Sequence, residues 1–509
     1  MPEIILGPPG TGKTTTLLGM VEDELAAGTA PEQIGFVSFT RKAAHEARDR
    51  AMKKFGMEKE RFPWFRTLHS LCFQALGMTS ADVLQGEILQ EFADWIGTPV
   101  TPKHKRGDMF EDEGRLFGNE RGDRIMQMEN LSRVRSVPLR DQYDRDSDDL
   151  SWHEVDRVAR GLAEFKARRG VYDFTDMLVL FTRQGWSPPL EVLFVDEAQD
   201  LSMLQWHVVH KLGAGARRVV IAGDDDQAIY NWAGAAVDYF VDLPGETRVL
   251  GQSYRVPMSV QRVANGIISR IEHRRHKEWS PRFEEGEVRQ IGLRDIDWDQ
   301  PDMLVLSRNA LYLNDVQKRI HQSGRMYERG PKRSISDKRR LQLYTWEAKL
   351  RKGLPVSVED ALKVYELMKS GTGVARGFKE LRAFPRDAMV TMADLKSHGG
   401  LLRDDIWHEA FDQDTQITGV EKEYIRSCLR NKERMSDAPR IRLSTIHGSK
   451  GGEAAEVVLI TDMAPRTYRE ALALPDDEAR VWYVAATRAK QKLTVVRPLT
   501  DRHFTLRAW

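Results

Sequence analysis

The stretch that decides the fold is Gly7-Pro8-Pro9-Gly10-Thr11-Gly12-Lys13-Thr14, which follows the apolar run Glu3-Ile4-Ile5-Leu6. It fits G-x-x-x-x-G-K-[ST] in full, and residues 14–25 are typical of a helix. In such a loop, backbone N–H groups and the positive end of the helix dipole surround phosphate oxygens. The alternative is a glycine-rich turn that matches the motif by chance. Such a turn would also have to lie between a strand and a helix in this order. The predicted nucleotide-binding residues are Gly7, Pro8, Pro9, Gly10, Thr11, Gly12, Lys13, Thr14 and Thr15.

Acidic residues follow a second apolar run. Residues 192–195 lead into Asp196-Glu197-Ala198-Gln199-Asp200. A strand that ends in two acids places them at the carboxyl edge of a parallel sheet, where ligands bind. We expect Asp196 and Thr14 to hold Mg²⁺, and Glu197 to orient and deprotonate the attacking water. Acidic residues after a strand commonly form a solvated surface loop without a site. In a chain that also has a phosphate loop, this interpretation is the less favoured one.

A third apolar run, 218–222, precedes Gly223-Asp224-Asp225-Asp226-Gln227. Gln227 is placed to bond the γ-phosphate or its water, as a glutamine does in GTPases. Taken alone this is a weak signal. Together with Lys13, which carries a charge toward the β- and γ-phosphates, it completes one half of a phosphoryl-transfer site.

Continuous apolar runs that alternate with helices predict a parallel sheet covered on both faces, and this pattern occurs twice. Further runs lie at 34–39, 302–307, 441–445, 455–461 and 493–497. The predicted class is therefore α/β, with two cores in tandem, each interrupted by a mainly helical insertion. The predicted parts are 1–77 and 171–249 for the first core, with insertion 78–170, and 250–330 and 438–509 for the second, with insertion 331–437.

Composition narrows the possible classes. The chain has 509 residues, 41% of them hydrophobic, which excludes wholesale disorder, and a net charge of +1, which excludes a uniformly basic coat protein. Its two cysteines, Cys72 and Cys428, cannot form a disulfide framework and favour a reducing, cytoplasmic compartment. No run reaches the ~18 apolar residues of a membrane span, so we expect no membrane partner.

In this order, the phosphate loop, the 196–200 stretch and the 223–230 stretch resemble the UvrD/PcrA/Rep-like superfamily 1 DNA helicases. Further stretches similar to motifs of that family are Ser38–Ala44, Arg66–Ser70, Tyr172–Leu178, Gln252–Arg255, Leu443–Glu453 and Tyr483–Ala489. The resemblance covers most of the chain. It implies two RecA-like motor domains that use ATP and Mg²⁺.

The resemblance also implies roles for residues outside the phosphate loop. Arg255 and Arg488, expected in the second core, match two arginine fingers, which contribute ~10³–10⁵ in rate where they have been studied. Tyr254 matches a residue that stacks on adenine, and Glu453 one that meets the ribose. A surface salt bridge is the ordinary role of either arginine alone.

Single-strand binding without sequence preference needs aromatic faces beside a basic groove. By resemblance, Phe39 and Trp232 stack on bases, while other residues contact the DNA backbone. Core packing is the commoner role of an aromatic residue alone, and the motif context reverses this for Phe39 and Trp232. We call the predicted DNA-contacting set the strand track: Phe39, Thr40, Thr67, His69, Tyr230, Trp232, Thr445 and His447.

The expected function is an ATP-dependent helicase that moves 3′→5′ on single-stranded DNA, acts at single-strand/duplex junctions and works as a monomer. An alternative is a DNA-stimulated ATPase that remodels nucleoprotein or is recruited by a partner, with little unwinding. Short insertions, and Ala233 where the family has arginine, motivate it. A motor directed at RNA is a third, weaker option. The basic run 332–352 either grips duplex DNA or forms a solvated helix face.

Overall fold

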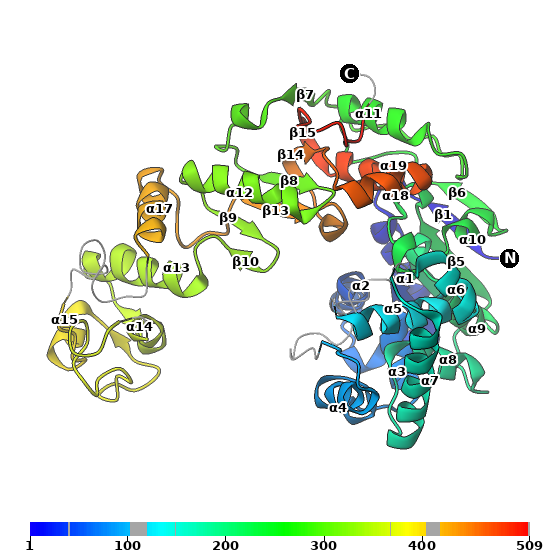
Figure 1. Cartoon of the computed structure of the whole chain (residues 1–509), viewed down its shortest axis with the longest axis horizontal. Helices are drawn as coiled ribbons and strands as arrows, with labels where there is room; N and C mark the ends of the chain where they lie inside the picture. The colour runs from blue at the N-terminus through cyan, green and yellow to red at the C-terminus, as the bar shows by residue number, and fades with distance from the viewer. Residues whose placement is uncertain (39–40, 102–119, 148, 367, 404–417, 507–509) are drawn as a thin grey trace. The chain divides into compact units, whose positions relative to one another are not determined.

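The computed structural model describes residues 1–38, 41–101, 120–147, 149–366, 368–403 and 418–506. By its contacts the chain divides into two compact units. The first comprises Met1–Glu284 and Ala473–Val484, and the second Glu285–Leu472 and Ala485–Trp509. Figure 1 labels most helices and strands of both units. Among the described residues, no helix combines the length and apolar character needed to cross a membrane.

The first unit contains a six-stranded parallel sheet in the order β3-β2-β4-β5-β1-β6. Its strands are β1 (Glu3–Leu6), β2 (Ile34–Ser38), β3 (Phe65–Arg66), β4 (Val192–Asp196), β5 (Arg218–Gly223) and β6 (Glu246–Val249). Leu6 is level with Gly223, and Ser38 with Asp196. The residues that follow β1, β4 and β5 therefore leave the sheet at one edge.

Helices cover both faces of this sheet, as its uninterrupted apolar strands require. Val192 and Phe194 of β4 pack with α1 and α2, whereas Leu193 and Val195 point to the opposite face, toward α3, α8 and α9. These helices are α1 (Lys13–Ala26), α2 (Arg41–Phe55), α3 (Leu68–Ala75), α8 (Phe174–Arg183), α9 (Met203–Gly213) and α10 (Val237–Asp242). The first unit also contains α11 (Met258–Ile268).

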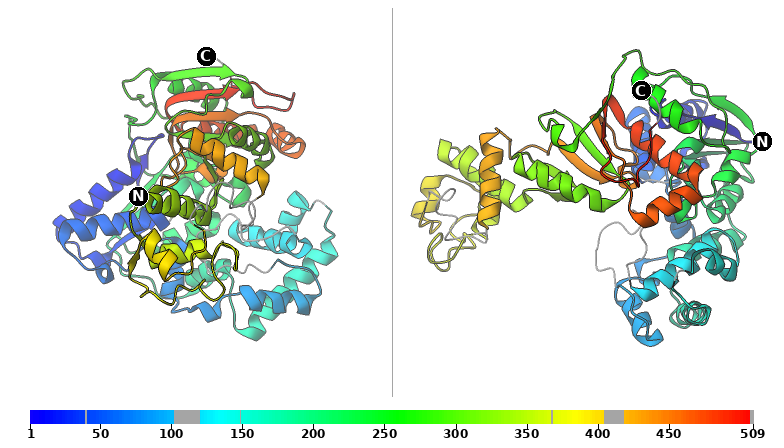
Figure 2. Two further views of the ribbon diagram at one scale, coloured as in Figure 1. Left: turned by 90° about the vertical axis from the view of Figure 1, so that its left-hand side faces the viewer. Right: turned by 45° about the horizontal axis from the view of Figure 1, so that its top comes forward.

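The first insertion has a core of its own. It consists of α4 (Gly86–Ile96), α5 (Arg121–Val134), α6 (Leu139–Asp146) and α7 (Trp152–Arg169). Phe92, Ile125, Val155 and Leu162 are among the residues buried between these helices. The helices lie together in every view of this unit (Figures 1 and 2). The stretch predicted as a polar helical insertion is therefore helical over its described residues.

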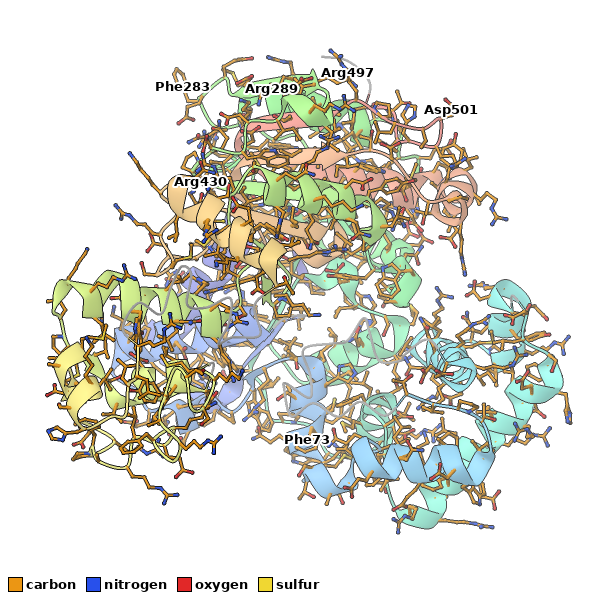
Figure 3. The ribbon with its side chains drawn as sticks, turned by 60° about the vertical axis from the view of Figure 1, so that its left-hand side comes forward. Phe73, Phe283, Arg289, Arg430, Arg497 and Asp501 are labelled. Carbon is orange, nitrogen blue, oxygen red and sulfur yellow. The ribbon has the colours of Figure 1, made fainter. Side chains whose placement is uncertain are left out.

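The second unit contains a seven-stranded sheet in the order β10-β9-β13-β8-β14-β15-β7. Its strands are β7 (Glu287–Ile291), β8 (Met303–Ser307), β9 (Tyr327–Arg329), β10 (Lys332–Arg333), β13 (Ile441–Thr445), β14 (Ala454–Ile460) and β15 (Ala489–Val496). Only β10 pairs antiparallel. At the β7 edge, Arg289 (labelled in Figure 3) donates to Thr494 Oγ1 at 3.0 Å and thereby ties β7 to β15.

Short helices and a small sheet make up the second insertion. Its elements are α13 (Asp337–Leu343), α14 (Val358–Tyr365), α15 (Met392–Ser397), α17 (Gly419–Arg430) and the strand pair β11 (Val356–Ser357) and β12 (Met389–Val390). Trp346, which is fully buried, joins the same apolar cluster as Val305 of β8. The remaining helices of the unit are α12 (Leu313–Gln322) and α18 (Pro465–Ala473), and α19 (Pro475–Ala486) crosses the boundary at Val484.

The basic run 332–352 is largely engaged within its own unit. Arg340 is buried and donates to the Met435 carbonyl at 2.9 Å, and Arg339 pairs with Glu421. Lys338 pairs with Glu366. Part of the run therefore holds the insertion together, although Lys332 and Arg333 are exposed.

Two parallel sheets with helical insertions confirm the predicted fold class, two RecA-like domains in tandem. The predicted division at residues 249 and 250 stays a prediction. It coincides with the end of β6, but the first compact unit continues to Glu284 and takes in residues 473–484.

Candidate functional site

The loop after β1 has the backbone of a phosphate cradle. Gly10 and Gly12 have φ of +73° and +81°, which non-glycine residues adopt at a cost. Gly12 is the N-cap of α1 and provides no side-chain cap. The first N–H groups of α1 are therefore available to an anion. Thr11 Oγ1 donates to the Pro8 carbonyl at 2.8 Å and closes the turn.

Lys13 lies inside this loop. Its Nζ donates to the Gly7 carbonyl at 2.8 Å, and the side chain is buried. A Cβ atom on Gly7 would stand 1.9 Å from Lys13 Cγ, so glycine is required there. The ammonium group is thus held at the loop, where a phosphate oxygen can replace the Gly7 carbonyl as its hydrogen-bond acceptor.

Thr14 and Asp196 meet as predicted for a pair of magnesium ligands. Thr14 Oγ1 donates to Asp196 Oδ2 at 2.9 Å, across from the end of β4. Burial and the charge of Glu197 raise the pKa of Asp196 to about 7, against the opposing effects of Lys13 and Thr14. A buried carboxyl group that lacks enough positive charge favours a cation beside it. Thr14 and Asp196 therefore fit Mg²⁺, which takes one or two carboxylates together with substrate phosphates.

Glu197 has a left-handed backbone, with φ of +54°. Its N–H donates to Asp196 Oδ1 at 3.0 Å, and its Oε2 accepts from Gln199 Nε2 at 2.5 Å. Gln199 Oε1 in turn accepts from the Asp224 N–H at 3.0 Å. The fully buried Gln199 therefore connects the end of β4 with the end of β5.

The acidic turn, Asp224, Asp225 and Asp226, is completely buried after β5. Gln227 Nε2 donates to Asp224 Oδ2 at 2.7 Å, so this turn sets the position of Gln227. Two cations face it, because Lys277 reaches all three carboxylates and Arg274 pairs with Asp226.

Residues 253–255 lie directly on the phosphate loop. Ser253 Oγ donates to the Pro9 carbonyl at 2.7 Å, and the Tyr254 N–H to the Gly10 carbonyl at 2.9 Å. A Cβ on Gly10 would be 2.3 Å from Arg255 Cβ. Arg255 lies within the first compact unit, Met1–Glu284, and its assignment to the second core stays a prediction. The Tyr254 side chain is 75% exposed beside the loop.

Four further predicted residues lie in the second unit. Arg488 donates to the Gly452 carbonyl at 3.3 Å, and Glu453 pairs with Lys490 at 3.2 Å. Thr445, the last residue of β13, accepts from the Gly448 N–H at 3.2 Å and so shapes the turn that carries His447. The sequence motif 443–453 is therefore one continuous strand end and loop.

The described strand-track residues of the first unit differ in exposure. Trp232 is 44% exposed, and its ring centroid is 6.4 Å from that of Tyr230. Thr67 and His69 are buried: Thr67 caps α3 through Ser70 N, and His69 packs edge-on against Phe174. Phe39 and Thr40 lie outside the described residues.

The sequence did not single out Ser253, Gln199 or Lys277. Three consecutive aspartates after an apolar strand were a signal that a cation must lie nearby, since such carboxylates are rarely buried unpaired. Nothing in the sequence showed which of the basic residues at 274–277 would provide it.

The geometry describes a protein with an ATP-type phosphate site on a tandem α/β fold, and the family comparison agrees. The family of the UvrD/REP helicase N-terminal domain matches residues 1–247, and that of the UvrD-like helicase C-terminal domain matches residues 411–498. The chain belongs to the UvrD-like helicase family.

Two relatives show how similar in sequence this chain is to other proteins of the family. The chain is 27% identical over 309 residues to the ATP-dependent DNA helicase PcrA of Staphylococcus aureus. It is 26% identical over 302 residues to the enzyme of the same name from Staphylococcus epidermidis. Each match covers 54% of this chain and 39% of the relative, so the chain matches about two-fifths of the length of these proteins.

Proposed function

We propose that this chain is an ATP- and Mg²⁺-dependent helicase that moves 3′→5′ along single-stranded DNA and unwinds duplex at junctions. The observation that carries the proposal is the meeting of Lys13, Thr14, Asp196 and Glu197 at one edge of the first sheet, with Gln227 following the neighbouring strand. Such a group suits ATP hydrolysis. The 3′→5′ direction and the monomeric state come from the family resemblance.

Thr14 and Asp196 are the residues that would hold Mg²⁺, which supplies positive charge to the β- and γ-phosphates. The N–H groups of residues 10–14 and Lys13 bind the phosphates. Glu197 holds the attacking water and accepts its proton. Gln227 and Arg255 orient the γ-phosphate, and by resemblance Arg488 serves as the second arginine finger, Tyr254 as the adenine stack and Glu453 as the ribose contact.

The strand track provides the DNA contacts in this proposal. Trp232, exposed and close to Tyr230, suits stacking on bases, which contributes about 1–3 kcal/mol per base. Thr67 and His69 are buried, which favours support of the loop that meets the DNA backbone over direct contact of their side chains with it. Buried free thiols at Cys72 and Cys428 suit the reducing cytoplasm that we propose as the location.

The test is a strand-displacement assay with 3′-tailed and 5′-tailed duplexes, using the wild type and Glu197→Gln. We expect ATP-dependent unwinding of the 3′-tailed substrate only. Glu197→Gln should bind ATP and DNA normally and lose hydrolysis by at least about 100-fold, because it removes the base alone. Unwinding from the 5′ tail alone would refute the direction, and normal turnover by the variant would refute the role of Glu197.

A second candidate is a DNA-stimulated ATPase with little unwinding of its own. The short elements of the second insertion favour it, as does Ala233 in the turn that bears Trp232. DNA-stimulated hydrolysis without strand displacement in the assay above would select this function. Stronger stimulation by RNA than by DNA would select the RNA-directed motor.

A further inference from the structure

Lys277 is a buried cation that the proposed chemistry does not use. Its Nζ lies 3.2 Å from Asp224 Oδ1, 2.5 Å from Asp225 Oδ1 and 3.0 Å from Asp226 Oδ2. All four side chains are at most 1% exposed. The ammonium group of Lys277 therefore lies within ion-pair distance of all three carboxylates of the acidic turn.

The acidic turn needs this cation. A carboxylate without a partner in a dry interior costs several kcal/mol, and three in succession add mutual repulsion. Arg274 neutralises Asp226 through two hydrogen bonds, at 2.7 and 2.5 Å. The Asp225 carboxylate also accepts from the Arg275 N–H at 2.9 Å. For Asp224, Lys277 is the only cation with an ion pair in the described part of the chain.

We propose that Lys277 is a positioning residue for ATP hydrolysis, which acts through Asp224 on Gln227. Asp224 Oδ2 accepts from Gln227 Nε2 at 2.7 Å, and Asp224 Oδ1 accepts from the Asp226 N–H at 3.3 Å. Only an ionised Asp224 keeps both oxygens as acceptors. Lys277 favours the ionised form, in which Asp224 holds the amide of Gln227 in one orientation. The inference rests on the proposed function.

The charges around Asp224 set the direction of its titration. Burial raises the pKa of Asp224, as do Asp226 and Asp225, whereas Lys277 and Lys13 lower it. The buried phenol of Tyr483 and the guanidinium of Arg274 also face this carboxylate. The raising influences outweigh the lowering ones, and removal of the ammonium group would raise the pKa of Asp224 further. Asp224 would then either hold a proton at a higher pH or stay charged without its ion-pair partner.

The test compares Lys277→Met, Lys277→Arg and the double variant Lys277→Met/Asp224→Asn in the full-length protein. We expect Lys277→Met to lower kcat of the DNA-stimulated ATPase about 100-fold at pH 7, since small misplacements cost rates of that order. KM for ATP should change less than about threefold, and the acidic limb of the kcat profile should move to higher pH. Lys277→Arg should keep most of the activity. The double variant should recover at least about tenfold, because removal of both partners of a buried pair costs less than removal of one, and an asparagine oxygen still accepts from Gln227.

A matched control is Lys211→Met, which removes another lysine of the first unit. Lys211 donates to the Phe181 carbonyl at 2.6 Å and has no ion pair with the acidic turn. Its kcat and pH profile should stay those of the wild type. An equal loss in Lys277→Met and the double variant, or a loss that follows only the unfolded fraction, would overturn the proposal.

A readout without turnover separates this inference from the proposed function. In protein labelled with ¹⁵N-glutamine, the side-chain amide signal of Gln227 should titrate at a higher pH in Lys277→Met than in the wild type. If the wild type lacks ATPase activity but the signals behave this way, the proposed function fails, whereas the link from Lys277 through Asp224 to Gln227 stands. Identical signals in both proteins would refute the role.

Discussion

Gly7 shows how one residue controls the phosphate site. Its carbonyl accepts from Lys13 Nζ, and the space where a side chain would begin is taken by Lys13 Cγ and Cδ. The glycine is therefore required by packing, because its own φ is not in the left-handed region. Lys13 can fold over its own loop only if position 7 has no side chain.

Gly7→Ala should therefore displace Lys13. We expect ATP affinity to fall about tenfold to a hundredfold, since a hydrogen bond to a charged group contributes about 1.5–3 kcal/mol. A titration with a fluorescent ATP analogue would measure this loss. Gly19→Ala is the matched control, because it lies within α1 with nothing within 4 Å of its Cβ. It should bind ATP normally and gain about 0.5–1 kcal/mol in stability; unchanged affinity in Gly7→Ala would contradict the packing argument.

At the scale of elements, a partly buried ionic network joins the first insertion to the sheet helices. Arg133 of α5 pairs with Asp173 at 2.7 Å and with Asp176 at 2.9 Å, at the start of α8. Lys166 of α7 meets both carboxylates at 2.7 Å. Burial alone would raise the pKa of Asp173, but Arg133 and Lys166 outweigh it and hold the pKa below its usual value.

Arg133→Met should destabilise the first unit by about 2 kcal/mol near pH 7, because it removes charged hydrogen bonds from partly buried carboxylates and leaves them only Lys166. A carboxyl group whose pKa is lowered on folding stabilises above its unfolded pKa, about 3.9 for Asp, and loses that contribution as the pH falls. The difference from the wild type should therefore shrink below about pH 4. Urea unfolding at several pH values would measure it.

The control for this network is Arg160→Met, which breaks an exposed i,i+4 pair with Asp156. Such pairs contribute about 0.5 kcal/mol or less, so its unfolding curve should overlie that of the wild type. An equal loss of stability in both variants would show that the partly buried pairs of Arg133 contribute no more than an exposed pair.

At the scale of the whole molecule, the first unit is built from two separate parts of the chain. Residues 473–484 return to it from the C-terminal region. Arg480 donates to the Asp225 carbonyl at 3.0 Å and to the His273 carbonyl at 2.7 Å, and Asp477 accepts from Asn231 at 2.5 Å. The returning segment therefore contacts the acidic turn and the loop that bears Trp232.

Arg480→Met should consequently lower the stability of the first unit by about 2 kcal/mol, the range for hydrogen bonds from a charged group. Calorimetry of the full chain would show this as a lower unfolding temperature. Arg466→Met, which breaks an exposed pair with Glu470 on α18, should leave the trace unchanged. An unchanged unfolding temperature in Arg480→Met would mean that the contacts of residues 473–484 add little to the stability of the first unit.

The sequence predicted the central strands well and the edges poorly. Residues 3–6, 192–195 and 441–445 were identified as strands, and β1, β4 and β13 cover them. The edge strands β6 and β7 were not predicted, because both are partly exposed and carry charged residues. A central strand of a parallel sheet is apolar on both faces and visible as a run, whereas an edge strand is defined by its neighbours.

The sequence by itself determined the family, the phosphate loop and the order of the acidic strand ends, because glycines, a lysine and paired acids must follow one another closely along the chain to bind phosphate. Only the tertiary structure decided that Lys277 faces the acidic turn and that Ser253 and Arg255 lie on the phosphate loop. These contacts join residues more than 50 positions apart, and the pairing of a buried charge depends on what folding brings next to it.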